Sequence, residues 1–335
     1  MRVAILAPVA WRTPPRHYGP WEQVASNIAE GLIRLGIDVT LFATGDSITA
    51  SKLSAVCDTG YEEDRSQDAK VLECLHISNL MERASEFDII HNNFDFLPLT
   101  YSGLIKPPVI TTIHGFSSSK IIPVYKKYNS IGHYVSISNA DRSPELDYIA
   151  TVYNGLNTKD FEFNDKPGDY IVYFGRIHPD KGTAEAIEIA QKSKRKLVIA
   201  GIIQDENYFN EKIKPQLNLQ IEYIGPVGPE RRNDLLGKAF ALLHPINFNE
   251  PFGMSVAEAM LCGTPVIAFN KGAMPELIKH EQTGFLVDNV DEAVEAIGWL
   301  KNIKRLNCYN WAVSQFSSDK VVSDYLKLYE QILSL

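Results

Sequence analysis

Short runs rich in β-branched residues alternate with helical patterns along the whole chain, and this alternation restricts the fold more than any other feature. Strands are expected in the first half at Val3–Ala7, Asp38–Ala43, Asp88–His91, Val109–Ile113, Tyr134–Ile137 and Ile149–Val152. In the second half they are expected at Tyr170–Phe174, Lys196–Ala200, Gln220–Ile224, Ala239–Leu243, Pro265–Ala268 and Gly284–Val287. Helical stretches such as Trp21–Leu35 and Ala69–Glu86 lie between them. Such alternation indicates βαβ units and therefore an α/β fold with mostly parallel sheets.

A polar, turn-rich stretch interrupts the alternation at Asn154–Asp169, where Asn-Gly and Pro-Gly pairs are typical of a linker. The 335 residues exceed what a single core ordinarily buries. We therefore predict two Rossmann-like, doubly wound domains, residues 1–160 and 161–316, facing each other across a cleft. The amphipathic segment 317–335 is expected to pack back on the first domain.

Composition excludes several classes of protein. The net charge of −8 and the lack of a basic block argue against a nucleic-acid binder. The longest apolar run, Val3–Trp11, is too short to span a bilayer, so no integral membrane segment is expected. The 4 cysteines are scattered and form no C-x-x-C pair, which favours reduced thiols and a cytoplasmic protein. Nothing in the sequence indicates an oligomeric state.

In open α/β sheets ligands bind beyond the carboxyl ends of the strands, so the loops after strands carry the most information. The loop from Gly175 to Gly182 follows one strand and places Arg176 and Lys181 near a helix start. Two cations beside a helix N-terminus suit a diphosphate. The alternative is a solvated loop with ordinary surface charges.

A second set of residues follows the strand that ends near His244. Glu250 lies on that loop, and the residues from Phe252 to Ser255 would form the first turn of a helix with free amides. Glu258 lies further along, too far to touch Glu250, so the two carboxylates would contact separate parts of one extended ligand. Carboxylates accept hydrogen bonds from sugar or ribose hydroxyls. The alternative is a capping glutamate and a surface glutamate.

The loop after the first strand supplies a third set. Gly19 lies just before a helix N-terminus, where bare backbone allows an anion to approach. The alternative is a flexible connection between strand and helix.

These segments together resemble the retaining, nucleotide-sugar-dependent glycosyltransferases of family 4, which have the GT-B fold. The resemblance covers nearly the whole chain. Its most specific parts are Glu250 to Glu258, the G-R-x-x-x-x-K-G loop and the segments Gly272–Leu277 and Gly284–Val287. Asn154–Asn157 resembles the family's N-G-V-D at the domain junction.

The resemblance implies a role for each site residue. Arg176 and Lys181 would bind the donor diphosphate and neutralise the leaving group. Glu258 would hold the ribose hydroxyls, and Glu250 would contact the transferred sugar. Further donor contacts would come from Gly19, Val227, Phe252, Gly253, Met254 and Ser255. His114 would lie beside the donor sugar, although a histidine that caps its strand is the alternative.

The acceptor side carries the weaker indications. Gly19 is followed by Pro20 where the family commonly has a second glycine, and proline lacks an amide donor. The surrounding segment also resembles bacterial sugar transferases, some acting on pterins. The residues that would line the acceptor side are Trp11, His17, Tyr18, Asn92 and Asn93. Core packing of the aromatic rings and capping of a strand end by the asparagines are the alternatives.

The expected reaction moves a hexose from a nucleoside-diphosphate sugar to a hydroxyl of a small molecule or glycan. No D-x-D sequence is present, so a metal-independent, front-face mechanism without a cofactor is expected. The donor would be a UDP-, GDP- or ADP-sugar, because contacts from the backbone near Val227 would not distinguish the bases. The alternatives are a nucleotide-sugar epimerase, a phosphorylase-like enzyme on the same fold, or a non-enzymatic nucleotide- or sugar-binding protein.

Overall fold

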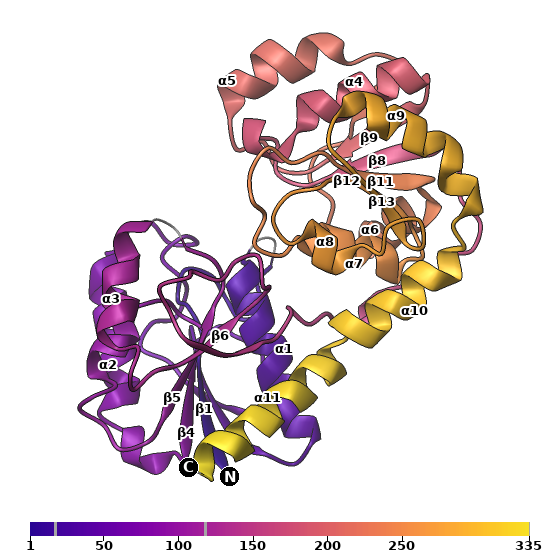
Figure 1. The fold of residues 1–335 in the computed structure, drawn as a ribbon. Coiled ribbons are helices and arrows are strands. Elements are labelled where there is room, and N and C mark those ends of the chain that lie inside the picture. Colours follow the sequence, from indigo (N-terminus) through magenta and orange to yellow (C-terminus); the bar gives the residue numbers. More distant parts are fainter. Residues whose placement is uncertain (17–18, 117–118, 335) are drawn as a thin grey trace. The chain divides into compact units, whose positions relative to one another are not determined.

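A computed structural model describes residues 1–16, 19–116 and 119–334. Its contacts divide the chain into two units, one of Met1–Leu156 with Ser318–Leu335 and one of Asn157–Ser317. The chain therefore passes between the units after Leu156 and again before Ser318, whereas the sequence had suggested boundaries at residues 160 and 316. Both units are α/β with parallel strands, as the alternation predicted (Figure 1).

In the described residues, the first unit contains a seven-stranded sheet in the order β3-β2-β1-β4-β5-β6-β7. The strands are β1 (Arg2–Leu6), β2 (Asp38–Phe42), β3 (Lys52–Ser54), β4 (Ile89–Asn92), β5 (Val109–Ile113), β6 (His133–Ser136) and β7 (Tyr148–Thr151). The helices are α1 (Pro20–Arg34), α2 (Ala69–Met81), α3 (Ile122–Lys127) and α11 (Ser318–Leu333). The sequence pattern did not predict β3, because its three largely exposed residues at a sheet edge show no alternation of apolar and polar side chains. The predicted helix Ala69–Glu86 ends at Met81, and a short 3-10 turn follows.

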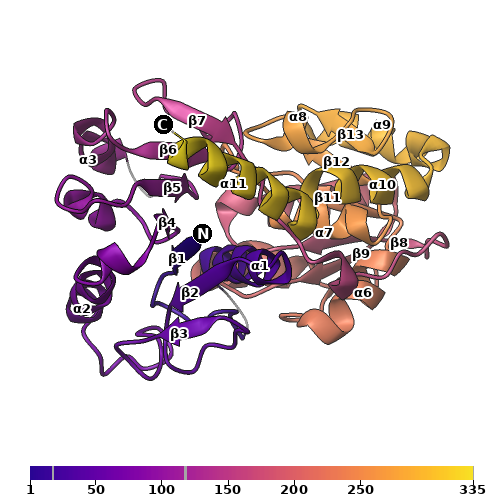
Figure 2. The same cartoon turned by 90° about the horizontal axis from the view of Figure 1, so that it is seen from below.

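Side chains of β1 alternate between the two faces of this sheet, as the pleat requires. Val3 and Ile5 join the core beneath α1 and α11, whereas Ala4 and Leu6 join the core beneath α2. Helices α1 and α11 lie side by side, as Figure 2 shows from below. They approach closely at Gly31, where an added Cβ would lie 2.2 Å from Cγ2 of Val322.

A buried hydrogen-bond network also ties α11 to the sheet. Nδ1 of His91 lies 2.6 Å from the Tyr329 hydroxyl, and its Nε2 lies 2.7 Å from Oγ1 of Thr112. The Tyr325 hydroxyl lies 2.7 Å from the same Oγ1. The chain's last helix is thus an integral part of the first unit, bound by polar as well as apolar contacts.

The second unit's described sheet has six strands in the order β10-β9-β8-β11-β12-β13. These are β8 (Tyr170–Phe174), β9 (Lys196–Ala200), β10 (Ile221–Tyr223), β11 (Ala241–His244), β12 (Val266–Phe269) and β13 (Gly284–Val287). The helices are α4 (Thr183–Ser193), α5 (Glu206–Tyr208), α6 (Pro229–Lys238), α7 (Met254–Leu261), α8 (Met274–Leu277), α9 (Val290–Trp299) and α10 (Arg305–Phe316). Helix α4 packs against α9, and α7 packs against α6 and α10 (Figure 1).

Most of the predicted linker is docked onto this second unit. The buried guanidinium of Arg305 donates from Nε to the carbonyl of Asn164 at 2.6 Å. The backbone N–H groups of Asn164 and Gly168 donate to the carbonyls of Cys262 and Lys238 at 3.1 and 2.7 Å. The polar composition of residues 157–169 therefore does not mark a freely flexible tether.

Candidate functional site

The order of strands in the second sheet reverses between β8 and β11. Connections from neighbouring strands leave in opposite directions at such a point, which opens a crevice at the carboxyl edge of the sheet. The loops that follow β8 and β11 are those with the motif residues Arg176, Lys181 and Glu250. Strand order thus brings together segments that are far apart in sequence.

Glycine at position 182 lets these two loops touch. Gly182 has a φ of +74°, and an added Cβ would lie 1.8 Å from the carbonyl oxygen of Pro245. Beside it, the backbone N–H of Asn247 donates to the Asp180 carbonyl at 2.7 Å. Only glycine fits this conformation and this close approach.

Lys181 and Glu250 form an ion pair where the loops meet, with Nζ of Lys181 donating to Oε2 of Glu250. Their side chains are only 15% and 13% exposed. The ammonium also lies 4.7 Å from the ring centroid of Phe248. The pair joins two motifs that the sequence had assigned to different parts of a ligand.

A third loop fixes the backbone of Glu250. Gly272 has a φ of +54°, and a Cβ there would lie 2.3 Å from the backbone nitrogen of Glu250. The N–H of Ala273 donates to the Glu250 carbonyl at 2.9 Å. The G-A-M-P-E-L segment therefore supports the loop with Glu250.

His244 ends β11 directly behind this ion pair. Its imidazole is buried, and Nε2 lies 3.8 Å from Oε2 of Glu250 without a hydrogen-bond partner among the described residues. Burial lowers the pKa of His244 to about 4; the Lys181 charge lowers it too, and the Glu250 charge opposes this. His244 is neutral at pH 7.

The N-terminus of α7 lies just beyond Glu250. Gly253 occupies the N-cap position with a φ of +96°, and no side chain caps this end in the described residues. The expected first turn at Phe252–Ser255 instead begins at Met254. Phe252 is 2% exposed and packs edge-to-face against Phe316, so its ring belongs to the core. The amides at this helix start and the half-buried side chains of Met254 and Ser255 are the groups here that could contact a ligand.

Glu258, one turn into α7, pairs with Arg232 of α6. The Nη1–Oε1 distance is 2.9 Å, and the side chains are 16% and 12% exposed for Arg232 and Glu258. The guanidinium also lies 4.3 Å from the ring centroid of Phe161. Burial raises the pKa of Glu258, and the charge of Arg232 and its hydrogen bond oppose this effect. Sequence reasoning missed Arg232, because it lies in a polar helix with several charges.

Arg176 does not share a partner with Lys181. Its Nη1 donates to Oε1 of Gln204, while Tyr173 donates to its carbonyl at 2.7 Å. The two cations of the predicted loop, Arg176 and Lys181, therefore have separate anchoring contacts.

Val227 lies half-buried in the loop between β10 and α6.

The first unit has its own reversal of strand order, between β1 and β4. Gly19, with a φ of +152°, is the N-cap residue of α1 there, and an added Cβ would lie 2.9 Å from Oε2 of Glu22. Glu22 is 3% exposed, and burial raises the pKa of its carboxyl to about 7 against hydrogen bonds from its own backbone and that of Trp11. Glu22 thus fixes the loop with Trp11 against the helix start, a role the sequence did not suggest. His17 and Tyr18 lie outside the described residues.

His114 lies after β5, next to the same edge of this sheet. Its ring stacks on Trp21 at a centroid distance of 5.6 Å, and Nε2 lies 3.1 Å from Oδ1 of Asn93. Burial lowers its pKa to about 3, so the imidazole is neutral at pH 7. Nδ1 of His114 and Nδ2 of Asn93 are buried without partners in the described part of the chain. Asn92 instead bonds within its own loop, to the N–H of Phe94 at 3.0 Å.

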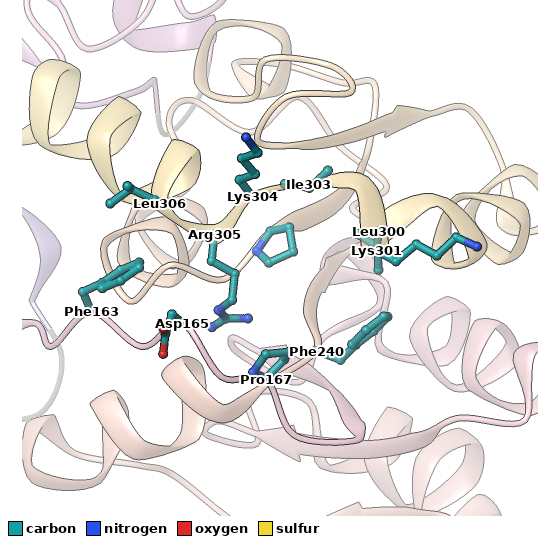
Figure 3. A pocket seen from close by; sticks show the side chains of 11 residues that line it. Phe163, Asp165, Pro167, Phe240, Leu300, Lys301, Ile303, Lys304, Arg305 and Leu306 are labelled. Atoms are coloured by element: carbon teal, nitrogen blue, oxygen red, sulfur yellow. The ribbon is translucent and has the colours of Figure 1, made fainter.

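Two further observations concern what surrounds these sites. The pocket in Figure 3 lies at the opposite edge of the second sheet, since Pro167, Phe240 and Pro265 precede β8, β11 and β12. Within the described residues, no three His, Cys, Asp or Glu side chains gather as they would around a metal ion. Across residues 1–16, 19–116 and 119–334, every helix is too short or too polar to cross a membrane.

Comparison with solved structures identifies the architecture. A glycosyltransferase involved in avilamycin A biosynthesis superposes with a TM-score of 0.73 and 23% identity over 100% of this chain and 98% of that one. An Anabaena HepE structure in complex with UDP and glucose gives 0.73 with 18% identity over 98% and 99% of the chains. Together with the two parallel sheets, these likenesses define a GT-B fold.

Sequence comparison gives the class of enzyme. Residues 157–309 match the family model for glycosyl transferases group 1. An uncharacterized glycosyltransferase of Methanocaldococcus jannaschii is 24% identical over 332 residues, covering 84% of each chain. Over residues 157–309 the second unit therefore resembles the glycosyl transferases group 1, and the chain is a glycosyltransferase.

Proposed function

We propose that this enzyme is a retaining, family 4 hexosyltransferase that moves a sugar from a nucleoside-diphosphate donor to a hydroxyl acceptor without a bound metal. The observation that carries the proposal is the Lys181–Glu250 pair at the β8–β11 reversal, next to the uncapped start of α7. It combines a cation, a carboxylate and free amides, which suit a diphosphate linked to a polyhydroxylated ring.

The diphosphate would bind Arg176 and Lys181, with further contacts from the amides of Met254 and Ser255. Breaking the anomeric C–O bond places negative charge on the departing diphosphate, and cations fixed in advance stabilise that charge. Both cations are anchored by neighbours, to Gln204 and to Glu250. These contacts hold both cations at the carboxyl edge of the sheet before the donor arrives.

The two carboxylates would divide the rest of the donor between them. Glu258, held by Arg232, accepts hydrogen bonds from the ribose hydroxyls. Glu250 contacts hydroxyls of the transferred sugar and is not the nucleophile. In a front-face reaction the acceptor attacks on the side that the diphosphate leaves, and the leaving phosphate takes the acceptor's proton.

The HepE complexes with UDP and with UDP-glucose favour a UDP-sugar as donor. GDP- and ADP-sugars are the alternative donors, and the experiment below distinguishes them from a UDP-sugar. The first unit would supply the acceptor side through Trp11, Asn92 and Asn93. His114 would lie beside the donor sugar, with Gly19 near the donor. The cysteines are free, which fits a reducing cytoplasm.

The test is donor turnover by Arg176→Ala and Lys181→Ala, with Lys301→Ala at the opposite edge of the sheet as a control. Each charge-assisted contact is worth about 1.5–3 kcal/mol, so each site variant should lose roughly tenfold to more than a hundredfold in rate. Lys181→Ala also leaves the buried Glu250 carboxylate without its partner, so its rate is measured below its own unfolding midpoint. The control should match the wild type. Near-normal rates in both site variants would refute the phosphate role. A thermal-shift panel with UDP, GDP and ADP identifies the base, since a ligand that binds the native state stabilises it.

A further inference from the structure

His244 is a buried group at the site for which neither the family resemblance nor the proposed mechanism has a use. It is 6% exposed, and its Nε2 has no hydrogen-bond partner among the described residues. That atom lies 3.8 Å from Oε2 of Glu250, the same oxygen that accepts from Lys181. One carboxylate oxygen therefore has a bonded cation on one side and an unbonded imidazole on the other.

Burial keeps His244 neutral, and the two charges beside it act on its pKa in opposite directions. Lys181, from the loop after β8, and Glu250, from the loop after β11, are the charged groups that act on it in the described residues. On the adjacent strand β12 its partner is Ala268, which carries no charge. While Lys181 neutralises Glu250, an additional positive charge on His244 has little to stabilise it.

Donor binding changes this balance, an argument that rests on the proposed role of Lys181. A diphosphate carries more negative charge than a carboxylate and competes with Glu250 for the ammonium. Glu250, only 13% exposed, is then left without its cation, and an unpaired buried carboxylate is costly. His244 is the nearest group that can become a cation by taking a proton.

We propose that His244 is a positioning residue that takes up one proton when the donor diphosphate binds Lys181, and replaces Lys181 as the partner of Glu250. The proton leaves hydronium or the buffer acid, whose bond to it breaks, and forms the N–H bond that faces Oε2; no bond between heavy atoms changes. Glu250 thereby stays ionised and is held in place to accept hydrogen bonds from the sugar.

The test is calorimetric titration of the protein with UDP at pH 7 in buffers of different ionisation enthalpy. The slope of the observed enthalpy against buffer enthalpy counts the protons taken up. The matched pair of variants is His244→Gln and His280→Gln, the second being a half-exposed histidine of the same unit. Protonation of UDP itself contributes equally to every protein and cancels in the differences.

The wild type and His280→Gln should take up as much as one proton more than His244→Gln. Their UDP affinity should also fall more steeply with rising pH, by up to tenfold per pH unit, because binding consumes a proton. Equal proton uptake and parallel pH profiles in all three proteins would overturn the role of His244 and leave the donor site intact. No binding of UDP, GDP or ADP by the wild type would refute the donor site and this inference together.

A second measurement does not depend on the stability of the His244 variant. In Lys181→Met the opposing cation is gone, so the His244 imidazole should titrate at higher pH in the free protein, as followed by NMR. An unchanged titration would also overturn the proposal, since Lys181 would then not control the charge of His244.

Discussion

Replacing Arg232 by methionine tests whether the cation behind Glu258 keeps a buried carboxylate ionised. Arg232 and Glu258 are 2.9 Å apart, and their side chains are 16% and 12% exposed. Removing one partner of a buried pair costs about 3–5 kcal/mol, and the small remaining exposure places the expected loss near the lower value. At about 2–4 °C per kcal/mol, the unfolding midpoint should fall by roughly 6–12 °C.

The loss should depend on pH, and its sign follows from the pKa of Glu258. Burial already raises that pKa, and Arg232 opposes the rise, so the variant raises it further. An acid whose folded pKa is raised contributes stability below its unfolded pKa, and this is lost as the pH rises through the folded pKa. Arg232→Met should therefore be destabilised more at pH 8 than at pH 5.

Thermal unfolding followed by circular dichroism at both pH values measures this effect. Arg231→Met is the matched control, because Arg231 is the exposed neighbour on the same helix. Adding Glu258→Gln to Arg232→Met should restore most of the midpoint and remove the excess pH dependence, since no buried charge remains. If Arg232→Met unfolds like Arg231→Met at pH 8, or the second substitution restores nothing, the argument from the ion pair is refuted.

Three further results are expected. Gly272→Ala should lower the unfolding midpoint and the donor affinity, because its Cβ would lie 2.3 Å from the Glu250 backbone. The control Gly298→Ala, which has open space around it, should lower neither. Equal unfolding midpoints for the two variants would contradict the packing argument. Glu22→Gln should be as stable as the wild type near pH 5 and more stable at pH 8, by up to about 3 kcal/mol. The reason is that the wild-type protein loses stability when a buried carboxyl with a pKa raised to about 7 ionises. Parallel curves of unfolding free energy against pH for the two proteins would argue against this. Activity should persist in excess EDTA, given that no D-x-D is present, and complete loss with rescue by magnesium or manganese would disprove metal independence.

Much of the fold follows from local sequence. The strands at Val109–Ile113, Tyr170–Phe174, Lys196–Ala200 and Gly284–Val287 have the predicted bounds, because a buried parallel strand needs a continuous run of β-branched and apolar residues. β3 was missed because an exposed edge of three residues needs no such run. The loops with the motif residues could also be placed, since they follow recognisable strands.

Which of those residues meet depends on the folding of the whole chain. Lys181 and Glu250 are 69 positions apart, and they pair because β8 lies beside β11 in the sheet. The Arg232–Glu258 pair and the unbonded His244 likewise depend on which loops and helices pack at the carboxyl edge. A short sequence pattern reports propensity and hydrophobic period, which are local properties of the chain. Burial and charge pairing instead depend on strand order, which is a non-local property. Local sequence therefore predicts the elements and the motif residues, whereas the packing of the sheet determines the partners of those residues.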